Sequence, residues 1–377
     1  MNIKGYVRTL PTANLSSQRA LSYRLHLDLP LLVMLTALLI AGLVVLYSAS
    51  GGDTEYVQRQ GIRILVAYSA LFLIAQLDPR TIQRWGGAAY LGGLLLLVTV
   101  VFYGVTVNGA QRWLRIPGVI TFQPSEIMKL AVPIMVAWYL ARHELPPRFK
   151  HLCVALILII VPTVLILQQP DLGTSLLIIS SGLFVIFLAG MSWWYIIAGL
   201  LSAAASFPLL WLFVLRDYQK RRILTMFDPE QDRLGAGWNI IQSKTAIGSG
   251  GWSGKGFMEG TQSQLDFLPE SNTDFIVAVL AEEFGLMGML LILALYLAIS
   301  ARCLMIAIGG RDTFGRLLAG GLTLVFFIYV FVNVGMVSGI LPVVGVPLPL
   351  VSYGGTSIVT LMTGFGIIMS VATHKNV

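Results

Sequence analysis

Asp274 is the side chain in this sequence that is best placed to do chemistry. It closes a glycine-rich polar segment that begins at Gly248, and an apolar run typical of a membrane-spanning helix follows it. Acidic side chains that enter a membrane are costly and usually mark a functional site. Such a carboxylate can act as a general base. A structural alternative stays open, because Thr273 could cap the helix and the helix dipole favours Asp274 near its first turn.

Five further residues fall into three short polar motifs near predicted helix ends. Arg112 and Trp113 lie together in one loop, where the tryptophan could equally be an interfacial anchor. Glu126 and Lys129 are three residues apart, so they share a helix face and can form an ion pair. An ion pair in a membrane helix is costly and indicates a polar cavity rather than lipid exposure. Asp171 is one more acid, at the outer end of a predicted span.

The glycine-rich stretch is not a nucleotide-binding loop. The pattern GxxxxGK[ST] fails, because Ser249 stands where its first glycine belongs and Gly256 follows Lys255 in place of serine or threonine. We expect either a turn-rich loop or backbone that approaches a ligand closely. A basic cluster at residues 216–222 lies before this stretch, and it could bind lipid headgroups or a pyrophosphate.

Membrane helices must position these side chains. Of the 377 residues, 56% are hydrophobic and only 11% are charged, whereas about a quarter are charged in an ordinary soluble domain. The apolar runs are continuous, which excludes the alternating strands of a transmembrane β-barrel. We predict an all-α polytopic membrane protein with ten transmembrane helices. Their approximate ranges are 30–50, 60–77, 86–106, 126–142, 151–168, 172–190, 193–215, 274–301, 314–338 and 350–373.

The distribution of basic residues predicts the orientation. With both termini cytoplasmic, thirteen Lys and Arg residues lie in inside segments and four lie in the short outside loops. The N-terminal segment 1–29 is then cytoplasmic, and a ten-helix membrane domain covers 30–373. Its large loop 216–273, between the seventh and eighth helices, is extracytoplasmic and should contain short helices. The net charge of +7 is explained by this orientation and does not indicate nucleic-acid binding.

The stretch 342–355 combines three prolines with a polar SYGG turn and carries no charge. Its prolines exclude a continuous helix. Non-helical backbone at membrane depth must face protein or a cavity, because lipid offers its polar groups no hydrogen-bond partner. We therefore expect this stretch to line a cavity.

Taken together, these motifs resemble one known family. They read GAQRWL, FQPSE followed by Lys129, QQPDLGTS, GSGGWSGKG, LPESNTDF and GILPVVGVPLPLVSYGG. With the ten apolar runs, they are similar to the SEDS family (shape, elongation, division and sporulation) and most similar to its elongation members. The resemblance extends from roughly residue 28 to residue 373.

The resemblance implies a peptidoglycan glycosyltransferase of the bacterial cytoplasmic (inner) membrane, with its active site on the extracytoplasmic side. Such an enzyme polymerises lipid II, a disaccharide-peptide on undecaprenyl pyrophosphate, by inverting transfer during cell elongation. Asp274 matches the catalytic acid of the family and would be the general base, although Asn272 replaces the histidine of its motif. We expect eight further residues to bind the substrate: Arg112, Trp113, Glu126, Lys129, Asp171, Lys244, Lys255 and Glu270.

The resemblance also implies partners. It points to a class B penicillin-binding protein, which is a transpeptidase, and to other membrane proteins of the elongation machinery, within membrane lipid and without nucleic acid. The sequence contains no recognisable metal-binding motif. Any Mg²⁺ or Mn²⁺ would therefore arrive with the pyrophosphate of the substrate.

Two other kinds of function stay open from the residues alone. A flippase or transporter of the lipid-linked precursor would also use intramembrane charges and broken helices. A scaffold that recruits the transpeptidase would need no catalytic acid. The concentration of polar residues toward the outer side favours an enzyme, because a transporter places its binding site near the midplane.

Overall fold

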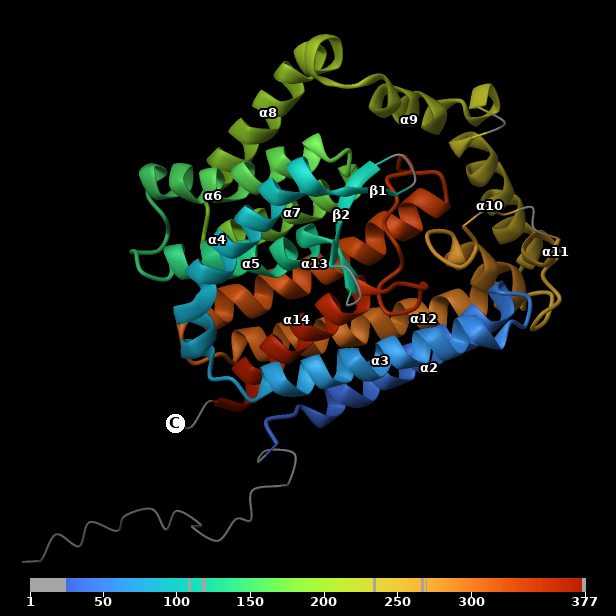
Figure 1. The fold of residues 1–377 in the computed structure, drawn as a ribbon, viewed down its shortest axis with the longest axis horizontal. Helices are drawn as coiled ribbons and strands as arrows, with labels where there is room; N and C mark the ends of the chain where they lie inside the picture. The colour runs from blue at the N-terminus through green and yellow to red at the C-terminus, as the bar shows by residue number, and fades with distance from the viewer. Residues whose placement is uncertain are drawn as a thin grey trace, which may run out of the picture.

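The computed structural model in Figure 1 describes residues 25–107, 110–116, 120–232, 235–265, 268 and 270–374. Most of the predicted N-terminal segment, residues 1–29, lies outside these described residues. Each of the ten predicted apolar stretches overlaps a helix. These helices are α2 (Leu29–Ala49), α3 (Thr54–Ala75), α4 (Pro79–Tyr103), α5 (Pro124–Leu140), α6 (Phe149–Gln168), α7 (Leu172–Leu188), α8 (Trp193–Leu209), α12 (Ile276–Ile308), α13 (Thr313–Val337) and α14 (Thr356–Thr373).

Seven helices in the described part of the chain are long and apolar enough to cross a membrane. They are α2, α4, α6, α12, α13, α14 and α8, which continues into the short π-helix η1 (Leu210–Val214). Helix α7 is also apolar but has only 17 residues. The chain is therefore a multi-pass membrane protein that is predominantly helical.

The protein is predominantly helical, as predicted, but the connection between α4 and α5 is not helical. It forms three antiparallel strands in the order β1-β2-β3. They are β1 (Val105–Val107), β2 (Ala110–Ile116) and β3 (Ile120–Phe122). The helix predicted over 86–106 ends at Tyr103, because Gly104 has extended backbone and the β-branched VTV sequence of β1 follows. Strand β2 carries Arg112 and Trp113, so this small sheet positions two predicted site residues.

Helix α13 lies in the middle of the bundle and buries most of its length (Figure 1). Two adjacent glycines allow α7 to approach it closely. A Cβ on Gly320 would lie 2.6 Å from a methyl group of Leu188, and a Cβ on Gly321 would lie 2.6 Å from Val185. Helix α14 packs along α3, and α12 packs against α13 and α2. Helix α8 has no buried residue.

The loop 216–273 contains the short helices that its length predicts. They are α9 (Asp217–Phe227), the 3₁₀-helix η2 (Pro229–Asp232), α10 (Ala236–Gly250) and α11 (Thr261–Gln264). Figure 1 shows the chain running from α8 through α9 to α10 as an arch over one side of the bundle. This arch packs α10 against α12 and brings Arg222 of α9 within electrostatic range of Arg112 on β2.

The glycine-rich stretch docks on a break in α12. Gly285 has a φ of +63° and interrupts the helix, so backbone groups on either side of it bond to the glycine-rich stretch instead of within the helix. The backbone N–H of Lys255 donates to the carbonyl of Glu282 at 3.0 Å. A Cβ on Gly254 would lie only 2.1 Å from the carbonyl oxygen of Glu283. The sequence suggested that these glycines form a turn-rich loop or allow the backbone to approach a ligand. The structure adds a third role, which is close contact between two backbone segments.

Several helices begin or end away from their approximate predicted ranges, and α12 and α14 matter for the site. Helix α12 begins at Ile276 rather than at 274 and continues to Ile308 rather than 301. Helix α14 begins at Thr356 rather than at 350. The chain from 339 to 355 is non-helical, as its prolines predict. This stretch returns to the start of α12, where Ser352 donates its hydroxyl to the carbonyl of Thr273 at 2.6 Å.

Replacing Gly285 with alanine tests this docking. We expect Gly285→Ala to lower the free energy of unfolding by more than about 1 kcal/mol, because alanine is strained at positive φ. A Cβ there would also lie 2.3 Å from the backbone nitrogen of Gly254. Thermal unfolding in detergent measures the change. Gly92→Ala in α4 is the control, since a Cβ there meets nothing within 4 Å. Equal stability of the two variants would contradict the docked arrangement.

Candidate active site

One polar cavity of about 210 Å³ collects five of the predicted site residues. It lies between β2, α5, α7, α13 and the non-helical stretch before α14. Its other lining groups include Gln123, Tyr329, Gly345 and the SYGG turn. The five predicted residues in its wall are Arg112, Trp113, Glu126, Lys129 and Asp171. The stretch 342–355 therefore faces a cavity, as expected.

Glu126 and Lys129 form a buried ion pair at the inner end of this cavity. Lys129 Nζ lies 2.7 Å from Glu126 Oε1, and each side chain is only 10% exposed. The Tyr329 ring lies beside the ammonium group, with its centroid 5.3 Å away. Pro124 at the first helical position starts α5, so both partners lie within the first two turns on one face. The ion pair predicted from their spacing is confirmed.

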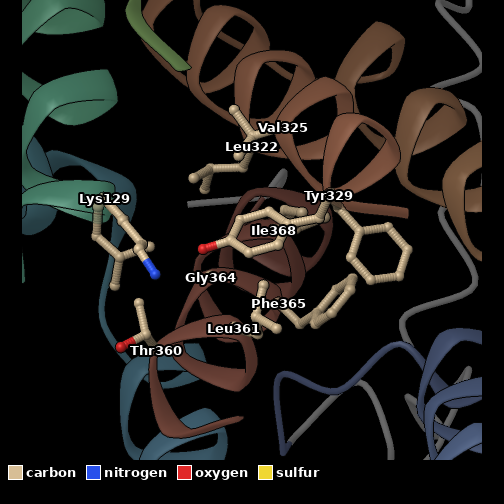
Figure 2. Close-up of a pocket in the computed structure, with 11 residues that line it drawn as sticks. Lys129, Leu322, Val325, Tyr329, Thr360, Leu361, Gly364, Phe365 and Ile368 are labelled. Carbon is tan, nitrogen blue, oxygen red and sulfur yellow. The ribbon is translucent and has the colours of Figure 1, made fainter. Parts of the chain in front are cut away.

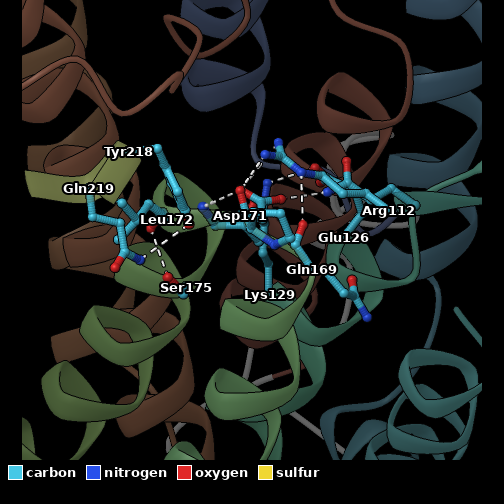
Figure 3. A network of polar contacts seen from close by, with 12 residues as sticks. Arg112, Glu126, Lys129, Gln169, Asp171, Leu172, Ser175, Tyr218 and Gln219 are labelled. Carbon is cyan, nitrogen blue, oxygen red and sulfur yellow. Dashed lines mark hydrogen bonds and ion pairs between the residues drawn. The ribbon is translucent and has the colours of Figure 1, made fainter. Parts of the chain in front are cut away.

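Asp171 holds the start of α7 and orients Arg112. Its Oδ1 accepts the backbone N–H of Thr174 at 3.1 Å, and its Oδ2 accepts the Gln123 amide at 2.7 Å. Arg112 Nη1 lies 3.9 Å from Asp171 Oδ1, and Arg112 Nε donates to the Gln169 carbonyl at 3.1 Å. Figure 3 shows Arg112 and Asp171 close to the ion pair described above. These bonds hold a guanidinium group in the cavity wall.

Hydrogen bonds from two other elements hold the backbone at and before Asp274 in place. Asn333 of α13 donates its amide to the carbonyl of Asp274 at 2.9 Å and to that of Val346 at 2.7 Å. The backbone N–H of Tyr353 donates to the carbonyl of Asn272 at 2.9 Å. The hydroxyl of Thr273 donates to the Glu270 carboxylate at 2.6 Å rather than capping α12, whose N-cap is Phe275. The capping alternative is therefore wrong for Thr273.

The carboxylate of Asp274 borders the cavity. A Cβ on Gly345, which lines the cavity, would lie 3.4 Å from Asp274 Oδ2. Burial and the negative charge of Glu270 raise the pKa of Asp274 to about 6, although the positive charge of Arg222 opposes the shift. Burial lowers the pKa of Arg222, and Arg222 also interacts electrostatically with Arg112. Arg222 thus lies within electrostatic range of both Asp274 and Arg112, a residue of the cavity wall.

The remaining predicted residues are placed apart from the cavity wall. Lys255 pairs with Glu282 at 2.6 Å, where Glu282 is completely buried. Lys244 of α10 packs over Gly339, since a Cβ there would lie 2.4 Å from Lys244 Cε. Glu270 contacts Thr273 and acts on Asp274 through its charge. The structure thus gives Lys255 and Lys244 structural contacts elsewhere, while Glu270 stays next to Asp274.

Two residues at the site are missing from the predicted set. Arg222 belongs to the basic cluster recognised in the sequence, but nothing in that cluster distinguishes it from its neighbours. The structure distinguishes Arg222 from the other basic residues, because α9 directs this side chain toward Asp274. Tyr329 lies within an apolar run, and its position in the cavity has no sequence signal. Its role follows only from the packing of α13 against α5.

Two apolar cavities adjoin the ion pair. One of about 380 Å³ lies between α4, α5 and α14 and includes Glu126, Trp85 and Thr360 in its lining. The other, of about 40 Å³, lies between α5, α13 and α14 (Figure 2), where the Lys129 ammonium group and the Tyr329 hydroxyl point toward each other. Polar and apolar cavities therefore meet at one buried pair of charges.

Comparison with known proteins connects this arrangement to a family. A family model described as "cell cycle protein", which covers FtsW, RodA and SpoVE, matches residues 29–377. The chain belongs to the FtsW/RodA/SpoVE family. This is the SEDS family that the sequence motifs resemble, so that prediction is confirmed.

Relatives in the FtsW/RodA/SpoVE family have named activities. The peptidoglycan glycosyltransferase MrdB of Escherichia coli K12 is 53% identical over 93% of this chain and 95% of its own length. The probable peptidoglycan glycosyltransferase FtsW of Geobacter metallireducens is 36% identical over 92% of this chain and 95% of its own length. Both comparisons span almost the whole membrane domain.

Solved structures share the fold of this FtsW/RodA/SpoVE member. A chain from a study titled "Structural coordination of polymerization and crosslinking by a peptidoglycan synthase complex" has a TM-score of 0.81 and 30% identity. The alignment covers 92% of this chain and 97% of that chain. Thermus thermophilus RodA has a TM-score of 0.69 and 28% identity, with 92% of this chain and 96% of that chain covered.

Replacing Lys129 tests the energetic role of the ion pair. We expect Lys129→Met to lower the free energy of unfolding by about 3–5 kcal/mol, because Glu126 would remain buried without its partner. The double variant Glu126→Gln with Lys129→Met should recover most of that loss. Thermal and denaturant unfolding in detergent measure both. A single variant as stable as the unmodified protein would show that the pair is solvated rather than buried.

Proposed function

We propose that this protein, a peptidoglycan glycosyltransferase, polymerises lipid II into glycan strands during cell elongation with Asp274 as the general base. The observation that supports this best is the position of the Asp274 carboxylate. It borders a polar cavity that contains Arg112, Lys129 and Asp171 and is held there by bonds to its own backbone. A pKa of about 6 leaves it mostly ionised at neutral pH, as a base requires.

The proposed reaction is one inverting displacement. The Asp274 carboxylate removes the proton from the 4-hydroxyl of the acceptor sugar while that oxygen attacks the anomeric carbon of the donor. The bond from the anomeric carbon to the pyrophosphate oxygen breaks, and undecaprenyl pyrophosphate leaves. The protonated Asp274 then releases its proton to water. General base catalysis typically contributes about 10²–10⁴-fold, and holding two lipid-anchored substrates in place contributes the rest.

Positive charges near Asp274 suit the leaving pyrophosphate. Arg112 and Lys129 line the cavity, and Arg222 interacts electrostatically with Asp274. Guanidinium groups match phosphate oxygens with paired donors. The apolar cavity between α4, α5 and α14 reaches Glu126, and we assign it to the first part of the lipid tail. Lys244 and Lys255, which were also expected to bind substrate, have less support because of their other contacts.

The described residues contain no group of three or more His, Cys, Asp or Glu side chains placed to hold a metal ion. We propose that Mg²⁺ or Mn²⁺, if the reaction uses one, binds through the pyrophosphate of the substrate, as the sequence suggests. Such an ion would stabilise the negative charge that develops on the leaving oxygen.

The orientation in the membrane belongs to the same proposal. We propose ten crossings in the bacterial cytoplasmic membrane, both termini in the cytoplasm, and the active site and the loop 216–273 outside. The first and last described helices support this arrangement, because the N-terminal end of α2 lies beside the C-terminal end of α14. The rings of His26 and His374 stack 3.9 Å apart. The two ends of the described chain therefore lie on the same side of the bundle, which an even number of crossings requires.

A class B penicillin-binding protein is the proposed partner. The similar solved chain comes from a study of a peptidoglycan synthase complex in which polymerisation and crosslinking are coordinated. We propose that this protein likewise binds a class B penicillin-binding protein and, with it, other membrane proteins of cell elongation. The exposed apolar surface of α8, with no buried residue, leaves a long helix available for contacts with lipid or protein.

Replacing Asp274 tests the proposed base. We expect Asp274→Asn to lower the rate of glycan polymerisation from purified lipid II in detergent by about 10²–10⁴-fold. Its unfolding temperature should stay near that of the unmodified protein. Glu55→Gln is the matched control, because Glu55 is an exposed carboxylate paired with Arg59 at the start of α3. A folded Asp274→Asn variant with full activity would exclude the base. Movement of lipid II across liposomes without any polymer would instead indicate a flippase.

The pH profile of polymerisation tests the environment of Asp274. The base works as the carboxylate, so the rate should fall as the pH drops through about 6. Glu270→Gln removes a negative charge that raises this pKa and should move the fall in rate to lower pH. Arg222→Gln removes a positive charge that lowers this pKa and should move it to higher pH. Shifts in the same direction for both variants would contradict the assigned geometry.

A further inference from the structure

One face of α3 packs against the SYGG turn, residues 352–355, which lines the cavity beside Asp274. Tyr56, Gln60 and Arg63 are spaced four and three residues apart, so they share this face. The ring of Tyr56 meets the ring of Tyr353 edge-on, with centroids 5.2 Å apart. Arg63 Cζ lies 4.3 Å from the centroid of the Tyr353 ring. An aromatic ring and a guanidinium group of one helix therefore hold Tyr353.

Gln60 adds a hydrogen bond from the same face of α3. Its side-chain amide donates to the carbonyl of Ser352 at 3.2 Å, and the residue is only 2% exposed. The other polar atom of the side chain, Oε1, is buried and has no hydrogen-bond partner among the described residues. A buried acceptor without a partner costs about 1–3 kcal/mol. An apolar side chain of this shape would stabilise the fold about as well, so stability alone does not explain Gln60.

The SYGG turn connects α3 to the segment that ends at Asp274. The hydroxyl of Ser352 donates to the carbonyl of Thr273 at 2.6 Å. The backbone N–H of Tyr353 donates to the carbonyl of Asn272 at 2.9 Å. Two consecutive residues of the turn thus contact α3 through one set of groups and the residues just before Asp274 through another.

The glycines of the turn face the cavity. Gly354 and Gly355 both line it. A Cβ on Gly355 would lie 3.9 Å from the Cζ atom of Arg63, so Gly355 has the cavity as one neighbour and Arg63 as another. Gln60 and Arg63 themselves are not among the residues that line the cavity. Any effect of these two side chains on the reaction must therefore act through the turn.

We propose that Gln60 and Arg63 are positioning residues for glycosyl transfer, which hold the Asp274 carboxylate in place through the SYGG turn. The inference rests on the proposed function, because it requires Asp274 to act as the base. A misplacement of about 1 Å can lower a catalytic rate by about 10²-fold. Loss of one bond between α3 and the turn would therefore lower the rate without removing any group that contacts the substrate.

Replacing Gln60 tests the inference. Gln60→Met removes the bond to Ser352 and keeps the length of the side chain. We expect kcat for polymerisation of purified lipid II in detergent to fall by roughly tenfold, with KM changed by less than about twofold. The unfolding temperature should stay near that of the unmodified protein. The reason is that the variant removes one unpaired oxygen, Gln60 Oε1, and leaves another, the carbonyl of Ser352.

The pH profile separates positioning from a general loss of structure. Burial raises the pKa of Asp274, and the charges that act on it are Glu270, which raises the pKa, and Arg222, which lowers it. A displaced turn would expose the carboxylate and lower its pKa. The fall in rate near pH 6 should therefore move to lower pH in Gln60→Met. A variant that only unfolds more easily would lose the same fraction of its rate at every pH.

Arg63 gives an independent test of the same turn. Arg63→Met should lower kcat and move the pH profile in the same direction as Gln60→Met. Arg63→Lys should recover most of the rate, because an ammonium group can take the place of the guanidinium over the Tyr353 ring. Gln60→Met should also lower kcat little further in a protein that already carries Ser352→Ala, since Ser352 connects Gln60 to Thr273.

Gln76→Met is the matched control on the same helix. Gln76 also donates its side-chain amide to a backbone carbonyl, that of Leu25 at 2.6 Å, but it caps the opposite end of α3. Its kcat and pH profile should equal those of the unmodified protein.

Three outcomes would overturn the inference. Gln60→Met could keep the kcat of the unmodified protein, or it could lose rate without any shift in the pH profile. Gln76→Met could also shift the profile as far as Gln60→Met does. Failure of the proposed function looks different, because the unmodified protein would then make no polymer or would show no fall in rate near pH 6.

Discussion

The side-chain amide of Asn333 joins the two segments on which the site depends. It donates to the carbonyl of Asp274, before α12, and to the carbonyl of Val346, in the non-helical stretch before α14. Asn333 is fully buried in α13, so neither carbonyl has water as an alternative partner. Ser352 and Tyr353 add two further bonds to the same short segment. The carboxylate of Asp274 can therefore face the cavity while its backbone is held from behind.

The break in α12 gives this segment a second support. A straight helix from Ile276 would leave the glycine-rich stretch without backbone partners. Gly285 breaks the helix at one residue. The backbone around Gly254 packs against this break and forms hydrogen bonds with it. Lys255 then neutralises Glu282, which is completely buried. The large loop is thus attached to the bundle at a defined point, and the position of α9 over the site follows from that attachment.

The buried charged side chains of this bundle have partners of opposite charge or hydrogen-bond donors. Glu126 and Lys129 pair inside α5, and Asp171 is satisfied by an amide, a backbone N–H and a nearby guanidinium group. Burying a charge in a low-dielectric interior requires such partners. Asp274 differs, because the charge of Glu270 and its burial disfavour ionisation while Arg222 favours it. That balance raises the pKa of Asp274 to about 6, so its protonation changes just below neutral pH.

The sequence by itself determined the class of the protein and most of its helices. Long apolar runs in a membrane form helices, so a helix overlaps each of the ten predicted runs, and seven of the described helices are long and apolar enough to cross a membrane. The spacing of Glu126 and Lys129 determined their pairing, since helix geometry is local. Only the tertiary structure decided which polar motifs meet. The three-stranded sheet, the turn of Arg222 toward Asp274 and the entry of Tyr329 into the cavity all depend on contacts between segments far apart in the chain. Lys244 and Lys255 lie apart for the same reason: their partners, Gly339 and Glu282, come from other elements whose packing no local pattern encodes.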